Sequence, residues 1–208
     1  MSDFSRRALG AARLDPTVYE EVEHDRAASV QALVIVLLSA IAGAIGRLGS
    51  FTLAALAANT IVGVFGWVVW AGLCLAIGAR LVPRRPRTQS DIGASVRVLG
   101  FAAAPGICQA LAVIAPLRTP VLVLAQVWMI FAMAVAVRHA LDDKRTARAL
   151  GVSLAGWAAQ LAVVVILLTV APRLVDHRAA GGRPPADAVP TAGYLGVVKP
   201  SGVAPPVE

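Results

Sequence analysis

The chain has 208 residues, of which 58% are hydrophobic and 15% charged, and its mean hydropathy is +0.73. Soluble domains hold roughly 45–50% apolar and about 25% charged residues, so this composition excludes an ordinary soluble domain. The net charge is +7, but the 19 basic residues are dispersed between apolar blocks, with no dense stripe and no interleaved aromatic residues. Basic loops beside membrane spans explain that pattern, and we therefore predict no nucleic-acid partner.

Residues 1–26 form a polar N-terminal segment, which we predict to be helical and cytoplasmic. Within residues 1–14, one face of a helical wheel is apolar and the opposite face carries arginines. The apolar face consists of Phe4, Ala8, Ala11 and Ala12, and the basic face of Arg6 and Arg13. Such a weakly amphipathic helix suits an anionic membrane surface, although a frayed terminus is the alternative.

A second N-terminal helix is predicted to run into the first apolar block. Thr17 and Glu20 have the spacing of a capping box, in which a hydroxyl and a carboxylate satisfy the first free backbone N–H groups. Asp15 before Pro16 is an alternative cap, since proline suits the first helical position. We leave both starts open.

Five apolar blocks, each long enough or nearly long enough to cross a bilayer, follow in residues 27–171. They are 27–46, 56–79, 96–115, 121–137 and 150–171. A helix rises 1.5 Å per residue, so about 20 residues cross a hydrocarbon core of roughly 30 Å. The fourth block has only 17 residues, and a re-entrant hairpin is its alternative. We predict an all-α, polytopic integral membrane bundle of about five transmembrane helices.

The third block carries Pro105-Gly106 near its middle. Proline cannot donate a hydrogen bond to the carbonyl of Phe101, and its ring crowds the preceding turn. We therefore predict a kink in the third helix at Pro105 and Gly106.

The distribution of Arg and Lys between the loops predicts the orientation. Thirteen basic residues lie before the first block, between the second and third, and between the fourth and fifth, including Arg97 at the start of the third; only Arg47 and Arg118 lie in the opposite loops. Because cytoplasmic loops are enriched in Arg and Lys, we expect a cytoplasmic N-terminus and an extracytoplasmic C-terminus. Residues 172–208 are rich in Pro and Gly without apolar periodicity, so we predict a disordered tail there.

Residues that could perform chemistry are scarce inside the predicted spans. Apart from Arg97, near the start of the third, the spans contain no Asp, Glu, His, Lys or Arg. Ionisable groups within a membrane usually mark function, so their scarcity argues against an enzyme and against a bound cofactor. Glu21-x-x-His24 resembles half of a di-iron site but has no second copy, and we predict no metal.

An acidic run just before the first span is the strongest candidate interaction site. It comprises Tyr19, Glu20, Glu21, Glu23 and Asp25. Opposite charges attract more strongly near low-dielectric lipid than in bulk water. We expect the run to dock on the basic cytoplasmic loops, with Arg97 and Arg138 as ion-pair partners and Asp142 as a further candidate. A solvated helix beside the membrane is the alternative.

Several short stretches, in the same order along residues 4–170, resemble a known family. They are Leu14-Asp15 with Tyr19–Glu23, Ser90–Gly93, Arg97–Ala102 with Pro105-Gly106, Trp128, Ala136–Asp142, Thr146–Ala149 and Gly156-Trp157. In these the chain resembles the bacterial branch of the Yip-domain family of five-span membrane proteins. The resemblance implies a helical five-span fold with a cytoplasmic N-terminus. Eukaryotic relatives are associated with vesicle trafficking and Rab-type GTPases, but their Asp-Leu-Tyr-Gly-Pro motif is absent here.

These features favour a non-enzymatic membrane scaffold or interaction protein, in membrane organisation or a trafficking-like process. Its expected partners are the lipid bilayer and either other membrane proteins or further copies of the chain. A permease or channel for a small solute, lined by the broken third helix, is one alternative. An accessory subunit of a larger membrane complex is another. Seventeen Arg against two Lys, with abundant Ala and Gly, suggests a GC-rich bacterial genome, hence an inner-membrane location.

Overall fold

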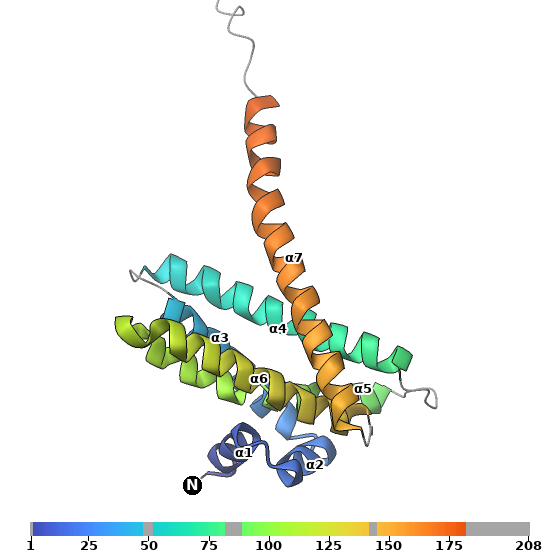
Figure 1. Ribbon diagram of the computed structural model, residues 1–208. Coiled ribbons are helices and arrows are strands. Elements are labelled where there is room, and N and C mark those ends of the chain that lie inside the picture. The colour runs from blue at the N-terminus through green and yellow to red at the C-terminus, as the bar shows by residue number, and fades with distance from the viewer. Residues whose placement is uncertain (1, 48–51, 82–88, 142–144, 182–208) are drawn as a thin grey trace, which may run out of the picture. The chain divides into compact units, whose positions relative to one another are not determined.

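The computed structural model describes residues 2–47, 52–81, 89–141 and 145–181, which are helical with no strand among them. Their elements are α1 (Asp3–Ala12), α2 (Pro16–His24), α3 (Ala28–Arg47), α4 (Leu53–Leu81), α5 (Gln89–Phe101), the 3₁₀ helices η1 (Ala104–Val113) and η2 (Ala115–Leu117), α6 (Arg118–Leu141) and α7 (Thr146–Gly181). Two compact units divide the chain, Met1–Leu167 and Leu168–Glu208. The first contains every element up to the early part of α7 (Figure 1).

Five helical stretches of the described residues are long and apolar enough to cross a membrane, which confirms the predicted all-α membrane bundle. They are Ala28–Arg47, Leu53–Arg80, Ile92–Val113, Ala115–Leu141 and Thr146–Ile166. The fourth stretch contains α6, one continuous helix of 24 residues. At 1.5 Å per residue α6 is about 36 Å long, more than a hydrocarbon core requires. Its length removes the reason for expecting a re-entrant hairpin.

The predicted boundary between membrane domain and tail, at residues 171 and 172, lies inside α7, which continues to Gly181. Proline is tolerated in membrane helices when neighbouring groups satisfy the freed carbonyl. α7 passes Pro172 without ending. The rest of the predicted tail, residues 182–208, lies outside the described residues.

The third candidate span is broken, and the bend lies at Ala102 and Ala103, just before the Pro105-Gly106 pair that predicts it. The amide of Ala102 still bonds to the carbonyl of Val98 at 3.3 Å, as in an α-helix. The next amide, of Ala103, reaches instead to Gly100 at 3.1 Å, and Gly106 likewise bonds to Ala103 at 2.9 Å. A proline disturbs the turn that precedes it, which explains why the bend is displaced towards the N-terminus.

After the break, η1 packs closely against α3. A 3₁₀ helix has three residues per turn, so Gly106, Gln109 and Ala112 lie on one face, and all three are buried. A Cβ atom at Gly46 of α3 would lie 2.9 Å from the Cβ of Ala112 and nearer still to the main-chain oxygen of Gln109. Glycine at this contact lets the two backbones approach, as small residues do between membrane helices.

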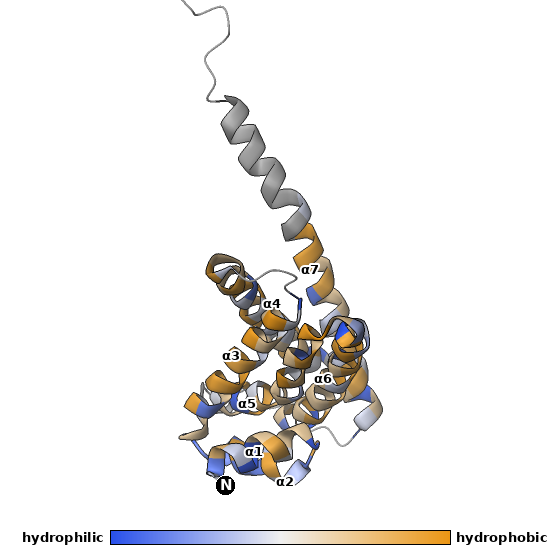
Figure 2. Cartoon of the chain, turned by 90° about the vertical axis from the view of Figure 1, so that its left-hand side faces the viewer, coloured by the Kyte–Doolittle hydropathy of each residue, from blue (hydrophilic) through white to orange (hydrophobic). Residues whose placement is uncertain are grey.

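Polar groups within the bundle bond to neighbouring helices. The Trp70 indole of α4 donates to the carbonyl of Ser153 in α7 at 3.0 Å, and the Ser153 hydroxyl donates to the carbonyl of Ile130 in α6 at 3.1 Å. Large apolar side chains face outwards instead, among them Leu33, Ile61 and Leu124. Figure 2 shows hydrophilic residues gathered on α1 and α2 and hydrophobic residues along α3, α4 and α6. This distribution suits a bundle surrounded by lipid.

Candidate interaction surface

The N-terminal segment forms a helical hairpin of α1 and α2, joined by a tight turn at Leu14 (Figure 1). Leu14 has φ of 63°, in the left-handed region that reverses the chain at a helix end. The amide of Asp15 bonds back to the carbonyl of Gly10 at 3.0 Å, which closes the turn. The predicted amphipathic face of α1 is directed inwards, with Ala11 fully buried and Phe4, Ala8 and Ala12 packed on the core.

Asp15 is the N-cap of α2. Its Oδ1 accepts from the amide of Thr17 at 3.0 Å and from the Thr17 hydroxyl at 2.8 Å. The capping box at Thr17 is therefore wrong, and the alternative start at Asp15-Pro16 is right. Aspartate caps well, and Pro16 occupies a position where a missing N–H costs nothing.

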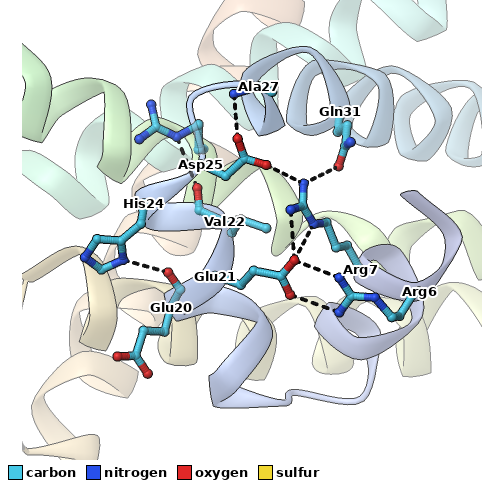
Figure 3. A network of polar contacts seen from close by, with 10 residues as sticks. Arg6, Arg7, Glu20, Glu21, Val22, His24, Asp25, Ala27 and Gln31 are labelled. Atoms are coloured by element: carbon cyan, nitrogen blue, oxygen red, sulfur yellow. Dashed lines mark hydrogen bonds and ion pairs between the residues drawn. The ribbon is translucent and has the colours of Figure 1, made fainter. Parts of the chain in front are cut away.

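Two arginines of α1 hold two carboxylates at the other end of α2 (Figure 3). Arg6 binds Glu21 through both guanidinium nitrogens, at 2.7 and 2.9 Å. Arg7, whose side chain is 11% exposed, lies 2.8 Å from Glu21 and 2.8 Å from Asp25. Arg7 also donates to Gln31 of α3 at 3.2 Å. This cluster, the α1–α2 ion-pair network, ties the hairpin to itself and to the start of the first span.

The network shifts the acidic groups towards their charged forms. Hydrogen bonds from Arg6 and then Arg7 lower the pKa of Glu21 to about 2. The pKa of Asp25 is lowered by Arg7 and by the amide of Ala27, which donates to it at 2.9 Å. The Glu21 side chain is 34% exposed, so solvent screens part of this attraction.

Arg97 of α5 binds the C-terminal end of α2 through main-chain oxygens and not through carboxylates. Its Nε donates to the carbonyl of Val22 at 3.1 Å, and a terminal nitrogen donates to the carbonyl of Glu23. Arg97 is 9% exposed. A cation at a helix C-terminus satisfies free carbonyls and the negative end of the helix dipole. The ion pair that we expected of Arg97 is thus replaced by a helix-capping contact.

Two aromatic residues attach the hairpin to α6. Tyr19 is fully buried and stacks on His139, with ring centroids 6.0 Å apart. Its hydroxyl donates to the carbonyl of Ala11 at 3.1 Å, and burial raises its pKa. Trp128 donates from its indole to the carbonyl of Ala12 at 2.8 Å.

The other predicted site residues lie apart from this network. Glu20 is exposed, and Glu23 contributes its carbonyl to Arg97. Arg138 has a buried Nε with no hydrogen-bond partner among the described residues. Asp142 lies outside the described residues, as do 82–88 of the first basic loop, and docking onto those loops stays a prediction. No described group of three His, Cys, Asp or Glu side chains is placed to hold a metal.

Arg7, Trp128 and His139 were not predicted as contacts of the hairpin. One signal of the ion-pair network is present in the sequence. Three arginines in residues 1–13 precede an acidic run in residues 19–25, with Pro16 between them. Two short helices of opposite charge joined by a turn favour pairing with each other over pairing with distant loops. The reason is that the entropy cost of loop closure is smaller when fewer residues separate the partners.

Comparison with known families identifies most of the chain. A family model of the Yip1 domain matches residues 14–170. The match begins at the turn between α1 and α2, and it includes α2 and the five candidate spans. Neither the curated proteins nor the solved structures searched contain a match.

Proposed function

Because the chain belongs to the Yip1 domain family, we propose that this multi-pass membrane protein is a non-enzymatic scaffold that holds partner proteins at the membrane. The proposed contact is the α2 outer face, defined by Thr17, Glu20 and His24. These three residues are exposed and follow one another at helical spacing. The expected partner is another membrane protein with a basic cytoplasmic segment.

The proposal rests on a difference in polar groups: those in the spans are mostly bonded, and the hairpin exposes a charged one. Within the described spans, the buried polar groups of Gln109, Ser153 and Trp70 bond to neighbouring residues or helices. The buried side-chain nitrogens without a partner among the described residues are the Nε1 of Trp67 and the Nε of Arg138. On the hairpin, Glu20 is exposed and its carboxylate has no described ion-pair partner. Exposed charged groups steer association and select partners by complementarity.

The packing of the broken span argues against the permease alternative. A transport site would need a polar space beside Pro105, as in other broken membrane helices. A Cβ atom at Gly106 would instead meet the Met129 sulfur at 2.9 Å and the Ser39 hydroxyl at a closer distance still. Gln109 donates to the Met129 sulfur at 3.4 Å and accepts from Arg47 at 3.3 Å. Side chains therefore fill the space beside Gly106 in this state.

The proposed location is a bacterial inner membrane, with the hairpin in the cytoplasm and the C-terminus outside. The asymmetry of thirteen against two basic residues supports this orientation. It places the α2 outer face among cytoplasmic proteins, where the acidic Glu20 is available to them.

Affinity purification in mild detergent tests the scaffold proposal, with Glu20→Lys as the variant. We expect the wild type to retain a stoichiometric partner and Glu20→Lys to lose it, because charge reversal opposes a basic partner. Asp3→Lys is the matched control, since it reverses another exposed acidic residue outside α2 and should keep the partner. Equal recovery from all three proteins, or solute flux in proteoliposomes with no partner, contradicts the proposal.

A further inference from the structure

The two helices of the hairpin lie on the two sides of the break in the third span. α2 packs against α5, which precedes the break, and α1 packs against η1, which follows it. The hairpin therefore bridges Ala102 and Ala103 without contributing any residue to the span itself. α1 also contacts α5, and both α5 and η1 contact α3 and α6.

At the break, the hydrogen bonds of the helix do not fix the angle between α5 and η1. Pro105 has no N–H group, and the hydrogen bonds around it change from the α to the 3₁₀ pattern. Without a continuous hydrogen-bond ladder, the angle between α5 and η1 depends on what packs against the two segments.

The hairpin is rigid enough to transmit such a constraint. The ion-pair network joins Arg6 and Arg7 to Glu21, and Tyr19 donates to the carbonyl of Ala11 between the same two helices. Gly10 and Val18 are in such close contact that a Cβ atom at Gly10 would overlap the Val18 side chain. Relative movement of α1 and α2 breaks several of these contacts at once.

Arg97 connects this rigid unit to the break. It lies four residues, about one helical turn, before Phe101, where α5 ends. Its guanidinium binds the last carbonyls of α2, at Val22 and Glu23. On the other side of the break, α1 is secured by its packing on η1 and by the hydrogen bond from Trp128 to Ala12.

We propose that the α1–α2 hairpin is a splint that sets the bend of the broken third span, with Arg97 as the positioning residue. Anything that lifts α2 from Arg97 frees the angle between α5 and η1. The hairpin thus couples events at the cytoplasmic surface to the shape of the bundle. The proposal does not depend on whether the protein is a scaffold, because it concerns geometry within the chain.

Distance measurements between spin labels on α5 and η1 test the splint in the full-length protein. Ile92→Cys supplies one site, since Ile92 is 49% exposed, and the exposed Cys108 of η1 supplies the other. Cys74 is fully buried, and protein without Ile92→Cys shows whether it takes up label. We expect one narrow distance distribution in the reference protein, whose only change is Ile92→Cys.

Two variants detach the hairpin by different routes. Arg97→Ala removes the contact with α2, and Glu21→Arg breaks the ion-pair network without touching any span. Both should broaden or shift the distance distribution, and should speed hydrogen exchange in residues 3–24 about tenfold or more, as expected for loss of a charge-assisted hydrogen bond. Arg97→Lys should restore part of the wild-type distribution, since an ammonium can still donate to one carbonyl.

Glu20→Arg is the matched control, because it reverses a charge on the same helix at an exposed side chain with no described ion-pair partner. It should leave the distribution unchanged, even if it abolishes partner binding. An unchanged distribution in Glu21→Arg and Arg97→Ala, despite faster exchange in the hairpin, overturns the splint and assigns the bend to packing on α3 and α6. Unchanged exchange in both variants also overturns it, because the attachment would then not rest on these contacts.

Discussion

At the scale of single residues, contacts between α3 and η1 depend on the absence of side chains. Gly43 and Gly46 face Gln109, and a Cβ atom at Gly43 would lie 2.7 Å from its side-chain oxygen. Elsewhere glycine has no such role, since a Cβ atom at Gly72 of α4 would meet nothing within 4 Å. Gly46, which is buried, and Gly72, which is exposed, therefore differ in what the missing side chain contributes.

Gly46→Ala should destabilise the bundle, because its methyl group would collide with the main chain of η1. Overpacking of this kind typically costs about 1–3 kcal/mol. Gly72→Ala is the matched control and should be neutral or slightly stabilising, since alanine forms helix better than glycine by roughly 1 kcal/mol. Thermal unfolding in detergent, followed by size-exclusion chromatography, measures both. A Gly46→Ala protein as stable as Gly72→Ala would contradict the close approach of α3 and η1.

The charge on Glu21 should make docking of α1 on α2 sensitive to acid. The pKa of Glu21 is about 2 in the folded protein, against 4.5 ordinarily, so its contribution is fully present above about pH 4.5. It is lost as the pH falls from 4.5 towards 2. For a half-exposed network the contribution is about 1 kcal/mol.

Hydrogen exchange in residues 3–12, corrected for intrinsic rates, measures this pH dependence. Glu21→Gln should exchange faster than the wild type at pH 7, and the difference should shrink as the pH falls below 4.5. Glu20→Gln should match the wild type at every pH. A difference between Glu21→Gln and wild type that persists unchanged to pH 2 would exclude ionisation of Glu21 as its cause.

At the scale of elements, helix starts depend on the cap that the chain selects. The sequence is compatible with two starts for α2, and the structure uses Asp15, with Thr17 donating its hydroxyl to that carboxylate. Whether a span is helical depends mainly on its own residues. Lipid offers no hydrogen-bond partners, so an apolar run must pair its backbone N–H and C=O groups internally, and a helix does this. Helix starts are therefore harder to predict from sequence than the spans.

Asp15→Ala should loosen the first turn of α2, because the amide of Thr17 loses its acceptor. Removing an N-cap costs about 1 kcal/mol, whereas Asp15→Asn should retain most of the cap. Thr17→Val should have a smaller effect than Asp15→Ala, since it removes only a hydroxyl donor. Amide exchange at residues 17–19 measures the three variants. If Thr17→Val proved the more damaging substitution, the capping box would be the correct description of this helix start.

At the scale of the whole molecule, five candidate spans give the two termini opposite sides of the membrane if each span crosses. The structure has five candidate spans, as the sequence predicts. The shortest predicted block, residues 121–137, lies within α6, which is long enough to cross a bilayer. The excess of Arg and Lys in three of the loops predicts the orientation.

Reporter fusions test this topology. Fusions at Arg85 and Lys144 should report the cytoplasm, and fusions after Arg47 and at Gly193 should report the outside. The physical reason is the excess of Arg and Lys in the loops assigned to the cytoplasm. A cytoplasmic signal at Gly193 together with the expected signal after Arg47 would mean that one of the later spans does not cross.

The number and approximate limits of the candidate spans can be predicted from the sequence alone, as can the position of the bend to within a few residues. These are local properties, because about 20 consecutive apolar residues or one proline suffice to impose them. The groups that the arginines bind could not be predicted in this way, because they depend on how the helices pack. Arg97 had several acidic side chains available in sequence and binds instead the carbonyl of Val22, 75 residues away. A guanidinium selects its acceptor by distance and geometry, and those exist only once α2, α5 and η1 have packed together.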